Sequence, residues 1–403
     1  MNRPGASRGF TLIELMVALV LGSLLILGLL KVFDASRVSY KLSEGLARVQ
    51  ENSRFAMDYL QRDLRMAGHM GCASDQARFQ GSPVRFASAF VAEEQPTEAE
   101  FDTAPEPLRF NTMLQGFEAA GTAPGATLDL AASGAWSGTP ALPGYISSLT
   151  PAPAAGSDVI ALRYFSAEGI AVKSFDGARI AVDTGRWNEV LSAGGIADPG
   201  LLAISDCASA AAFEATAVHK GGIDTVVQVS QSGLNRSSLA NRNFTAGQAT
   251  LYRAESQVYY VGFNPQASNE PTLYRARFVL APGSGGVTLL GGAPEALVEG
   301  VENMQLIYGL DSQTDQSRPP TGYVASQAVA SKVQPSNDTT PWRRVGLVQV
   351  AFLARSTERA GVPGAERSEP PRLLGVAVTP PDDGRYRAVY ESTIALRNRL
   401  YGN

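Results

Sequence analysis

The sequence predicts an α+β fold, in which a long N-terminal helix packs on a large antiparallel β-rich domain with long loops. An apolar run over residues 10–30 contains a single charged residue, Glu14. No proline interrupts the stretch between Pro4 and Pro83, so a helix can continue well beyond that run. The 40 glycines and 24 prolines have no period and gather after residue 80. That distribution favours a strand-based body with many turns over a helical bundle.

The apolar run is long enough to cross a membrane. Its 21 residues span about 30 Å at roughly 1.5 Å per residue, which is the thickness of the hydrocarbon core. A secretory signal has a shorter apolar region and an Ala-x-Ala-like exit, and neither feature occurs here. A plain signal anchor would explain the length but not the acid. A carboxylate in lipid costs roughly 2.5–3.5 kcal/mol unless a partner neutralises it, so Glu14 is a predicted functional residue.

Residues 31–68 have the pattern of an amphipathic continuation of the same helix. Apolar or small residues recur every three or four positions, at Leu42, Leu46, Val49, Ser53, Ala56, Leu60, Leu64 and Ala67. Charged and amide residues, such as Arg48, Glu51 and Asp58, occupy the opposite face. We therefore expect one helix over residues 10–67, about 87 Å long, that ends at Gly68 and packs its apolar stripe on a sheet.

Residues 69–403 form the predicted β-rich globular domain. Residues 73–155 are rich in Thr-Ala-Pro, Pro-Gly and Ser-Gly clusters, and we expect a loop-rich insert with one or two short elements. Enrichment in β-branched and aromatic residues between turn residues predicts the strands that follow. These are expected over 158–165, 169–175, 178–182, 201–206, 225–229, 249–263, 272–280, 287–290, 304–308, 342–355 and 386–400. Pro294 at a suitable starting position predicts a short helix over 294–302.

The two cysteines, Cys72 and Cys207, suit an exported protein with one disulfide. Closing a loop of 135 residues between them would stabilise the fold by about 5 kcal/mol in the chain-entropy model. Two unpaired buried thiols are the alternative.

Composition and motifs argue against several functions. A net charge of −4 disfavours a nucleic-acid binder. The Gly-x-Ser-x-Gly pattern at residues 5–9 has no strand before it, and no glycine-rich loop is followed by Lys-Ser/Thr. His69 and His219 lack metal-ligand spacing, and the stretch around Asp311 and Asp315 lacks the pattern of a calcium loop. We expect no catalytic residues, no bound metal and no cofactor.

The residues around the start of the apolar run resemble a known signal. A short leader with Arg3 and Arg8 ends in Gly9, and Phe-Thr-Leu-Ile-Glu follows over residues 10–14. This resembles the type IV prepilin signal. Residues 49–56, 63–68 and 71–72 resemble the helix end of PilW-type minor pilins. Residues 156–159, 297–302, 345–356 and 395–399 are similar in kind, which leaves mainly 73–155 unmatched.

The resemblance implies a maturation pathway and a location. A prepilin peptidase would remove the leader, residues 1–9, by cutting between Gly9 and Phe10, and would methylate the Phe10 amine. The chain would stay in the bacterial inner membrane through residues 10–30, with its body in the periplasm, before it enters the pilus fibre or tip. Glu14 would then direct subunit assembly by pairing with the amine of a neighbour.

The implied partners are other minor pilins and the major pilin, a tip adhesin of the PilY type, the prepilin peptidase and the inner-membrane pilus assembly platform. The function would be to prime pilus assembly, and so to support adhesion and twitching motility. Two alternatives stay open. One is a pseudopilin J-like subunit of type II secretion, and the other is a membrane-anchored periplasmic binding module.

Overall fold

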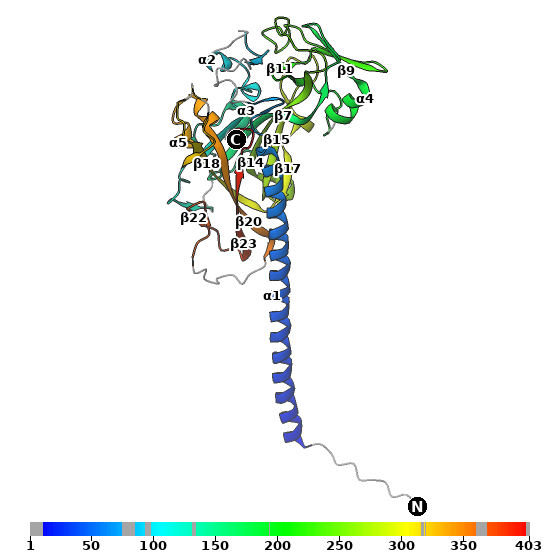
Figure 1. Ribbon diagram of the computed structural model, residues 1–403. Helices are drawn as coiled ribbons and strands as arrows, with labels where there is room; N and C mark the ends of the chain where they lie inside the picture. Colours follow the sequence, from blue (N-terminus) through cyan, green and yellow to red (C-terminus); the bar gives the residue numbers. More distant parts are fainter. Residues whose placement is uncertain are drawn as a thin grey trace, which may run out of the picture.

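The computed structural model describes residues 11–74, 85–92, 98–130, 134–192, 194–315, 318, 320–359 and 369–399. Its first element is the helix α1, Leu12–Leu64, with 53 residues and a length of about 80 Å. The first half of α1 extends beyond the body, and the second half lies along it (Figure 1). Gly68 follows with a φ of 84°, the left-handed conformation typical of a residue after a helix end. The long helix is confirmed within the described residues.

The second half of α1 buries a single stripe of side chains. Its buried residues are Gly45, Val49, Ser53, Ala56, Leu60, Asp63 and Leu64. Leu42, which the spacing places on this stripe, is 42% exposed, because the body first covers the helix at Gly45. The stripe therefore buries apolar surface only where a sheet lies beside the helix.

The described residues contain one large sheet, whose main path is β3–β11–β10–β14–β7–β4–β6. Strand β15 pairs with β14 and also with β16 and β17. The neighbours are antiparallel except β3 and β11, which are parallel. The strands are β3 (Arg85–Ser88), β4 (Leu114–Ala119), β6 (Gly138–Thr139), β7 (Val159–Ala171), β10 (Leu201–Ser205), β11 (Ser209–Glu214), β14 (Thr250–Asn264), β15 (Glu270–Val279), β16 (Thr288–Leu289) and β17 (Glu295–Glu299).

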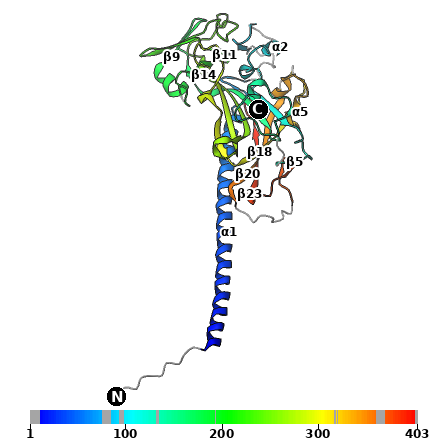
Figure 2. The same cartoon turned by 180° about the vertical axis from the view of Figure 1, so that it is seen from behind.

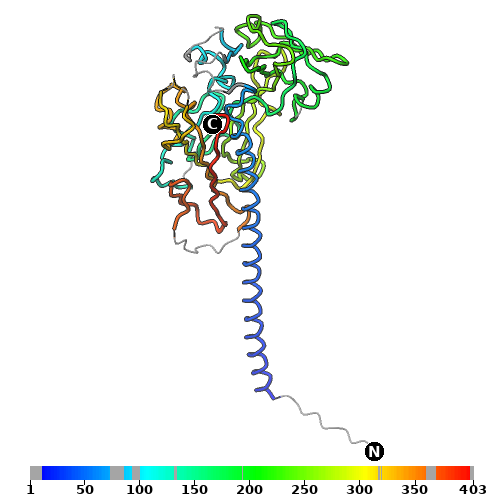
Figure 3. The backbone as a smooth tube through the Cα atoms, viewed as in Figure 1, coloured from blue at the N-terminus to red at the C-terminus, as the bar shows by residue number. Residues whose placement is uncertain are grey.

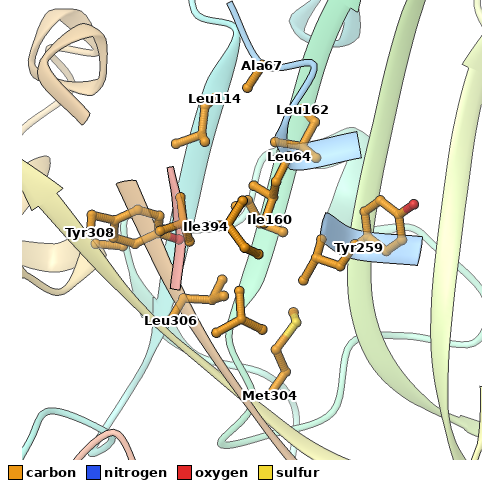
Figure 4. Packing of buried hydrophobic residues seen from close by; sticks show 14 of the residues in the cluster. Leu64, Ala67, Leu114, Ile160, Leu162, Tyr259, Met304, Leu306, Tyr308 and Ile394 are labelled. Carbon is orange, nitrogen blue, oxygen red and sulfur yellow. The ribbon is translucent and has the colours of Figure 1, made fainter. Parts of the chain in front are cut away.

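A second sheet, in the order β19–β18–β20–β23, lies against the large one. Its strands are β18 (Val301–Asp311), β19 (Val324–Ala328), β20 (Val345–Arg359) and β23 (Arg385–Ala395). Helix α1 packs against β20 and β23, as the view from behind shows (Figure 2). The main core lies where α1 and the two sheets meet. Leu64 of α1, Tyr259 of the large sheet and Leu306 of the second sheet all enter it (Figure 4).

Two smaller sheets, in the orders β12–β13–β9–β8 and β21–β22–β5, and the two-stranded sheet β1–β2 complete the described part of the body. The first belongs to a lobe at the end of the body farthest from the start of α1, which is green in Figure 3. Their strands are β5 (Thr127–Asp129), β8 (Ser174–Phe175), β9 (Arg179–Asp183), β12 (Ala217–Lys220), β13 (Asp224–Gln228), β21 (Arg372–Leu373) and β22 (Val376–Thr379). The remaining elements are short: β1 (His69–Met70), β2 (Ala73–Ser74), α2 (Glu98–Phe101), η2 (Glu106–Leu108), α3 (Gly144–Ser147), α4 (Thr184–Arg186), η3 (Trp187–Leu191), η4 (Pro265–Ala267), η5 (Leu290–Gly292), α5 (Ala330–Val333) and η6 (Thr340–Arg344).

The helix expected over 294–302 is wrong. Those residues form β17 and the start of β18, with Leu273 of β15 opposite Val298. Gly300 separates the two strands at a φ of 81°, and its N–H donates to the carbonyl of Pro271. A helix of nine residues is marginal in water, so pairing with the edge of β15 overrides the local helix signal.

The described part of 73–155 contains short elements, and none exceeds the six residues of β4. Several of them join the large sheet, because β3 pairs with β11 and β4 pairs with β7. Phe86, Phe101 and Phe110 of this segment are buried in a core cluster that they share with residues of β7, β10, β11 and β14. The segment is loop-rich, but it also closes one side of the large sheet.

Cys72 and Cys207 form a disulfide. The bond joins the turn after α1 to the connection between β10 and β11. It therefore ties the end of the helix to the large sheet across 135 residues of sequence.

Candidate assembly site on the exposed helix

The first half of α1 presents an apolar surface that no described part of the chain covers. The large apolar side chains that are at least half exposed are Leu12, Ile13, Leu15, Met16, Val17, Leu19, Val20, Leu21, Leu24, Leu25, Ile26, Leu27, Leu29, Leu30, Val32 and Phe33. Among the described residues, α1 is the one helix long and apolar enough to span a membrane, and its apolar window has no buried residue. Such a surface is stable in lipid or against similar helices.

Glu14 and Thr11 form a capping box at the start of α1. The Glu14 Oε2 atom accepts hydrogen bonds from the Thr11 N–H at 3.0 Å and from the Thr11 hydroxyl at 2.9 Å. In return the Glu14 N–H donates to Thr11 Oγ1 at 3.3 Å. These bonds satisfy donors that a helix start leaves free. They do not neutralise the charge, since the first cation along α1 is Lys31, roughly 25 Å away along the axis.

Gly9 and Phe10 lie outside the described residues. Cleavage between them, methylation of Phe10 and the pairing of Glu14 with a neighbouring amine therefore stay predictions. The geometry adds that Glu14 lies on the exposed first turn of the helix, one turn from the end where a new amine would form.

Sequence reasoning missed one charged residue, Asp63, which lies on the buried stripe of α1. The Asp63 Oδ2 atom accepts hydrogen bonds from Gln257 Nε2 at 2.6 Å and from the hydroxyl of Tyr259. The guanidinium of Arg275 lies 3.6 Å from the same oxygen. An acid three positions after Leu60, on a stripe of otherwise apolar or small residues, is the signal that could have revealed it.

A second ionic cluster joins the two main sheets where α1 emerges from the body. Arg355 of β20 donates to Glu270 of β15 at 3.0 Å and to Glu302 of β18 at 3.2 Å. Arg387 of β23 donates to Glu302 at 2.6 Å and to Asp383 at 2.7 Å. Burial raises the pKa of Asp383, but the hydrogen bonds from Arg387 and from the Arg385 N–H, together with the charges of Arg387 and Arg355, outweigh burial and lower that pKa to about 2. Asp383 therefore stays charged over the physiological pH range, and the cluster links β15 of the large sheet to β18, β20 and β23 of the second sheet.

Two of the residues considered for a metal, Asp311 and His69, bond to the backbone. Asp311 accepts hydrogen bonds from the backbone N–H groups of Gln313, Thr321 and Gly322, which shape its loop. His69 lies 2.9 Å through Nδ1 from the carbonyl of Phe165, whereas His219 lies on β12. Among the described residues, no group of three or more His, Cys, Asp or Glu side chains could hold a metal ion.

Comparison with known proteins gives matches to two families of pilin-related sequences. Residues 5–30 match the prokaryotic N-terminal methylation motif, and residues 258–398 match the family described as type IV pilus-assembly protein W. A type IV-like pilin from Thermus thermophilus is similar at 19% identity over 40% of this chain and 75% of that chain, with a TM-score of 0.20 that adds no support to the fold. No curated protein matches the chain. With the methylation motif at its start, the match over residues 258–398 and an exposed apolar helix, the chain is similar to membrane-anchored type IV pilins of the PilW family.

Proposed function

We propose that this pilin is a minor subunit that primes assembly of the type IV pilus. A prepilin peptidase cuts between Gly9 and Phe10 and methylates the new amine. The chain then waits in the inner membrane with its body in the periplasm, and it enters a small complex near the pilus tip. Pilins are structural proteins, and we assign no catalytic activity to this one. The observation that carries the proposal is the uncovered apolar surface of α1 with Glu14 at its start.

The partners follow from this role. Other minor pilins and the major pilin offer apolar helices that can pack against the first half of α1. The inner-membrane assembly platform moves the helix from lipid into the fibre, and a tip adhesin of the PilY type caps the complex. No nucleic acid takes part. The complex promotes pilus biogenesis, and through it adhesion and twitching motility.

Electrostatics gives Glu14 its role in this process. A carboxylate and an ammonium that are buried together neutralise each other, whereas removal of one leaves the other uncompensated at a cost of roughly 3–5 kcal/mol. The Phe10 amine of a neighbour is the cation that such a bundle would supply. Glu14 therefore sets the axial register in which a neighbouring helix docks.

The test is incorporation of the Glu14→Gln variant, which keeps the size of the side chain and removes its charge. We expect the variant to remain in the membrane, to keep its disulfide and to be lost from sheared pili. The matched control is Glu44→Gln, which removes an exposed acid from the same helix beyond the membrane-spanning part. Incorporation of Glu14→Gln at the level of the control would contradict the proposal.

Replacement of residues 10–30 by an unrelated apolar anchor without an acid separates assembly from tethering. The assembly role predicts that the replaced chain supports no piliation. If the protein is instead a pseudopilin J-like subunit, the replacement should impair type II secretion. If it is a tethered periplasmic binding module, the replaced chain should keep its function.

A further inference from the structure

A pair of buried acids lies at the joint between the large sheet and the second sheet. Asp158 precedes β7, is 2% exposed and carries no ion pair among the described residues. Its Oδ1 atom accepts from the N–H of Ala119 in β4 at 2.9 Å, and its Oδ2 atom accepts from the N–H of Leu306 in β18 at 2.9 Å. One carboxyl group therefore joins the two sheets through backbone hydrogen bonds.

The second acid is Glu118, the residue before Ala119 on β4, and it is 5% exposed. Its Oε1 atom accepts from the Thr122 hydroxyl at 3.4 Å, while its Oε2 atom has no hydrogen-bond partner in the described structure. The hydroxyl of Tyr308 in β18 is fully buried beside the pair and also lacks a partner there. The joint thus gathers two carboxyl groups and a phenol.

The neighbouring elements bring no neutralising cation to this joint within the described contacts. Helix α5 contributes the backbone of Ala330, and its Lys332 is exposed. In η6, Arg343 donates to the carbonyl of Asn111 and Arg344 to the carbonyl of Asp315. Strand β6 has no titratable residue.

Burial and proximity dictate how the pair titrates. Burial raises the pKa of Glu118 to about 7, against a hydrogen bond from Thr122 that lowers it. Burial, followed by the charge of Glu118, raises the pKa of Asp158 well above its ordinary value. Burial and the two acids likewise raise the pKa of Tyr308. Two carboxylates in one apolar site repel, so the pair retains a proton well above the pH at which exposed acids lose theirs.

We propose that the Glu118–Asp158 pair is a pH-responsive contact that holds the two main sheets together while it retains a proton and loosens when the proton leaves. Loss of the proton places a second negative charge beside the Asp158 carboxylate, and no contact among the described residues brings a cation there to screen it. The repulsion acts on the group that bonds both Ala119 and Leu306, so it weakens the joint between β4 and β18. This property of the body does not depend on the proposed role in pilus assembly.

The stability of the joint is expected to fall as the pH rises, because folding is linked to proton binding. The folded pKa of Glu118 lies above its unfolded value near 4.5, so the unfolded chain binds fewer protons between the two values and stability falls as pH rises. The loss begins above about pH 4.5 and is complete above about pH 7. A difference of that size corresponds to a weakening on the order of a hundredfold in the equilibrium constant.

Amide hydrogen exchange on the full chain in detergent tests the proposal. After correction for intrinsic exchange, we expect the opening constants at the Ala119 and Leu306 amides to rise on the order of a hundredfold from pH 5 to pH 8.5. Amides of β10, such as Ile204, serve as internal references in the same sample. In the Glu118→Gln variant, the two joint amides should follow the reference amides at both pH values.

Two outcomes would overturn the proposal. One is equal pH dependence at the joint amides and the β10 amides of the unmodified chain, a comparison that needs no variant to fold. The other is an unchanged pH dependence in Glu118→Gln. Glu168→Gln, which alters an exposed acid on β7, is the matched control and should behave as the unmodified chain does.

Discussion

Asp63 is predicted to be the polar residue that holds α1 to the large sheet. Its side chain is 4% exposed and contacts Gln257, Tyr259 and Arg275 from the two neighbouring strands β14 and β15. Asp63→Ala removes the acceptor and leaves two donors and a guanidinium without their partner in a site that water barely reaches. Breaking a buried charged cluster from one side costs roughly 3–5 kcal/mol, and the alanine adds a small loss from the cavity.

The assay is urea unfolding of the full chain in detergent, followed by tryptophan fluorescence. Trp342 is a suitable reporter because it is fully buried in the core cluster that receives α1. We expect Asp63→Ala to lower the free energy of unfolding by about 3–5 kcal/mol. Asp63→Asn keeps one acceptor oxygen and loses the charge, so its loss should be smaller, about 1–3 kcal/mol.

Asp58→Ala is the matched control, because Asp58 lies on the same helix and its side chain is exposed. A surface substitution of this kind changes stability by about 0.5 kcal/mol or less. If Asp63→Ala and Asp58→Ala unfold at the same urea concentration, the interpretation of Asp63 as an anchor is refuted.

Three further predictions concern the body. Reduction of the disulfide should lower the free energy of unfolding by up to about 5 kcal/mol, the chain-entropy value for a 135-residue loop, as measured by urea unfolding with and without reductant; an unchanged midpoint would contradict this. Leu60→Ala, at a fully buried position, should cost about 2–5 kcal/mol, whereas Leu42→Ala on the exposed part of the same stripe should cost far less, and equal losses would show that the stripe is not packed. Gly116→Ala would place a methyl group on the Tyr308 hydroxyl and should destabilise by about 1–3 kcal/mol, which thermal unfolding would reveal; wild-type stability would contradict the close packing at that site.

The long helix is predictable because its signals are local. An apolar run with one acid, a 3.6-residue spacing and the absence of proline all lie within the helix itself. Long strands such as β14 and β20 are also predictable from the sequence, since each is rich in β-branched and aromatic residues. The cysteine count indicated the Cys72–Cys207 bond because only one pairing is available.

The other parts of the fold depend on contacts between residues far apart in sequence, which local patterns do not predict. The parallel pairing of β3 with β11 joins segments more than 120 residues apart, and β3 alone has only four residues. Residues 294–302 became strand because β15 offered an edge, which no local pattern records. In the sequence, nothing distinguishes Asp158 and Glu118 from exposed acids. Both are buried because β4 and β18 come together around Asp158 in the fold.

The central claim is that a new amine forms at Phe10 beside Glu14. Mass spectrometry of the N-terminal peptide, from the protein purified out of its own cells, tests this most directly. We predict a mature chain that begins with N-methylated Phe10. A chain that still begins at Met1, or one that is cut after residue 30, would contradict the account.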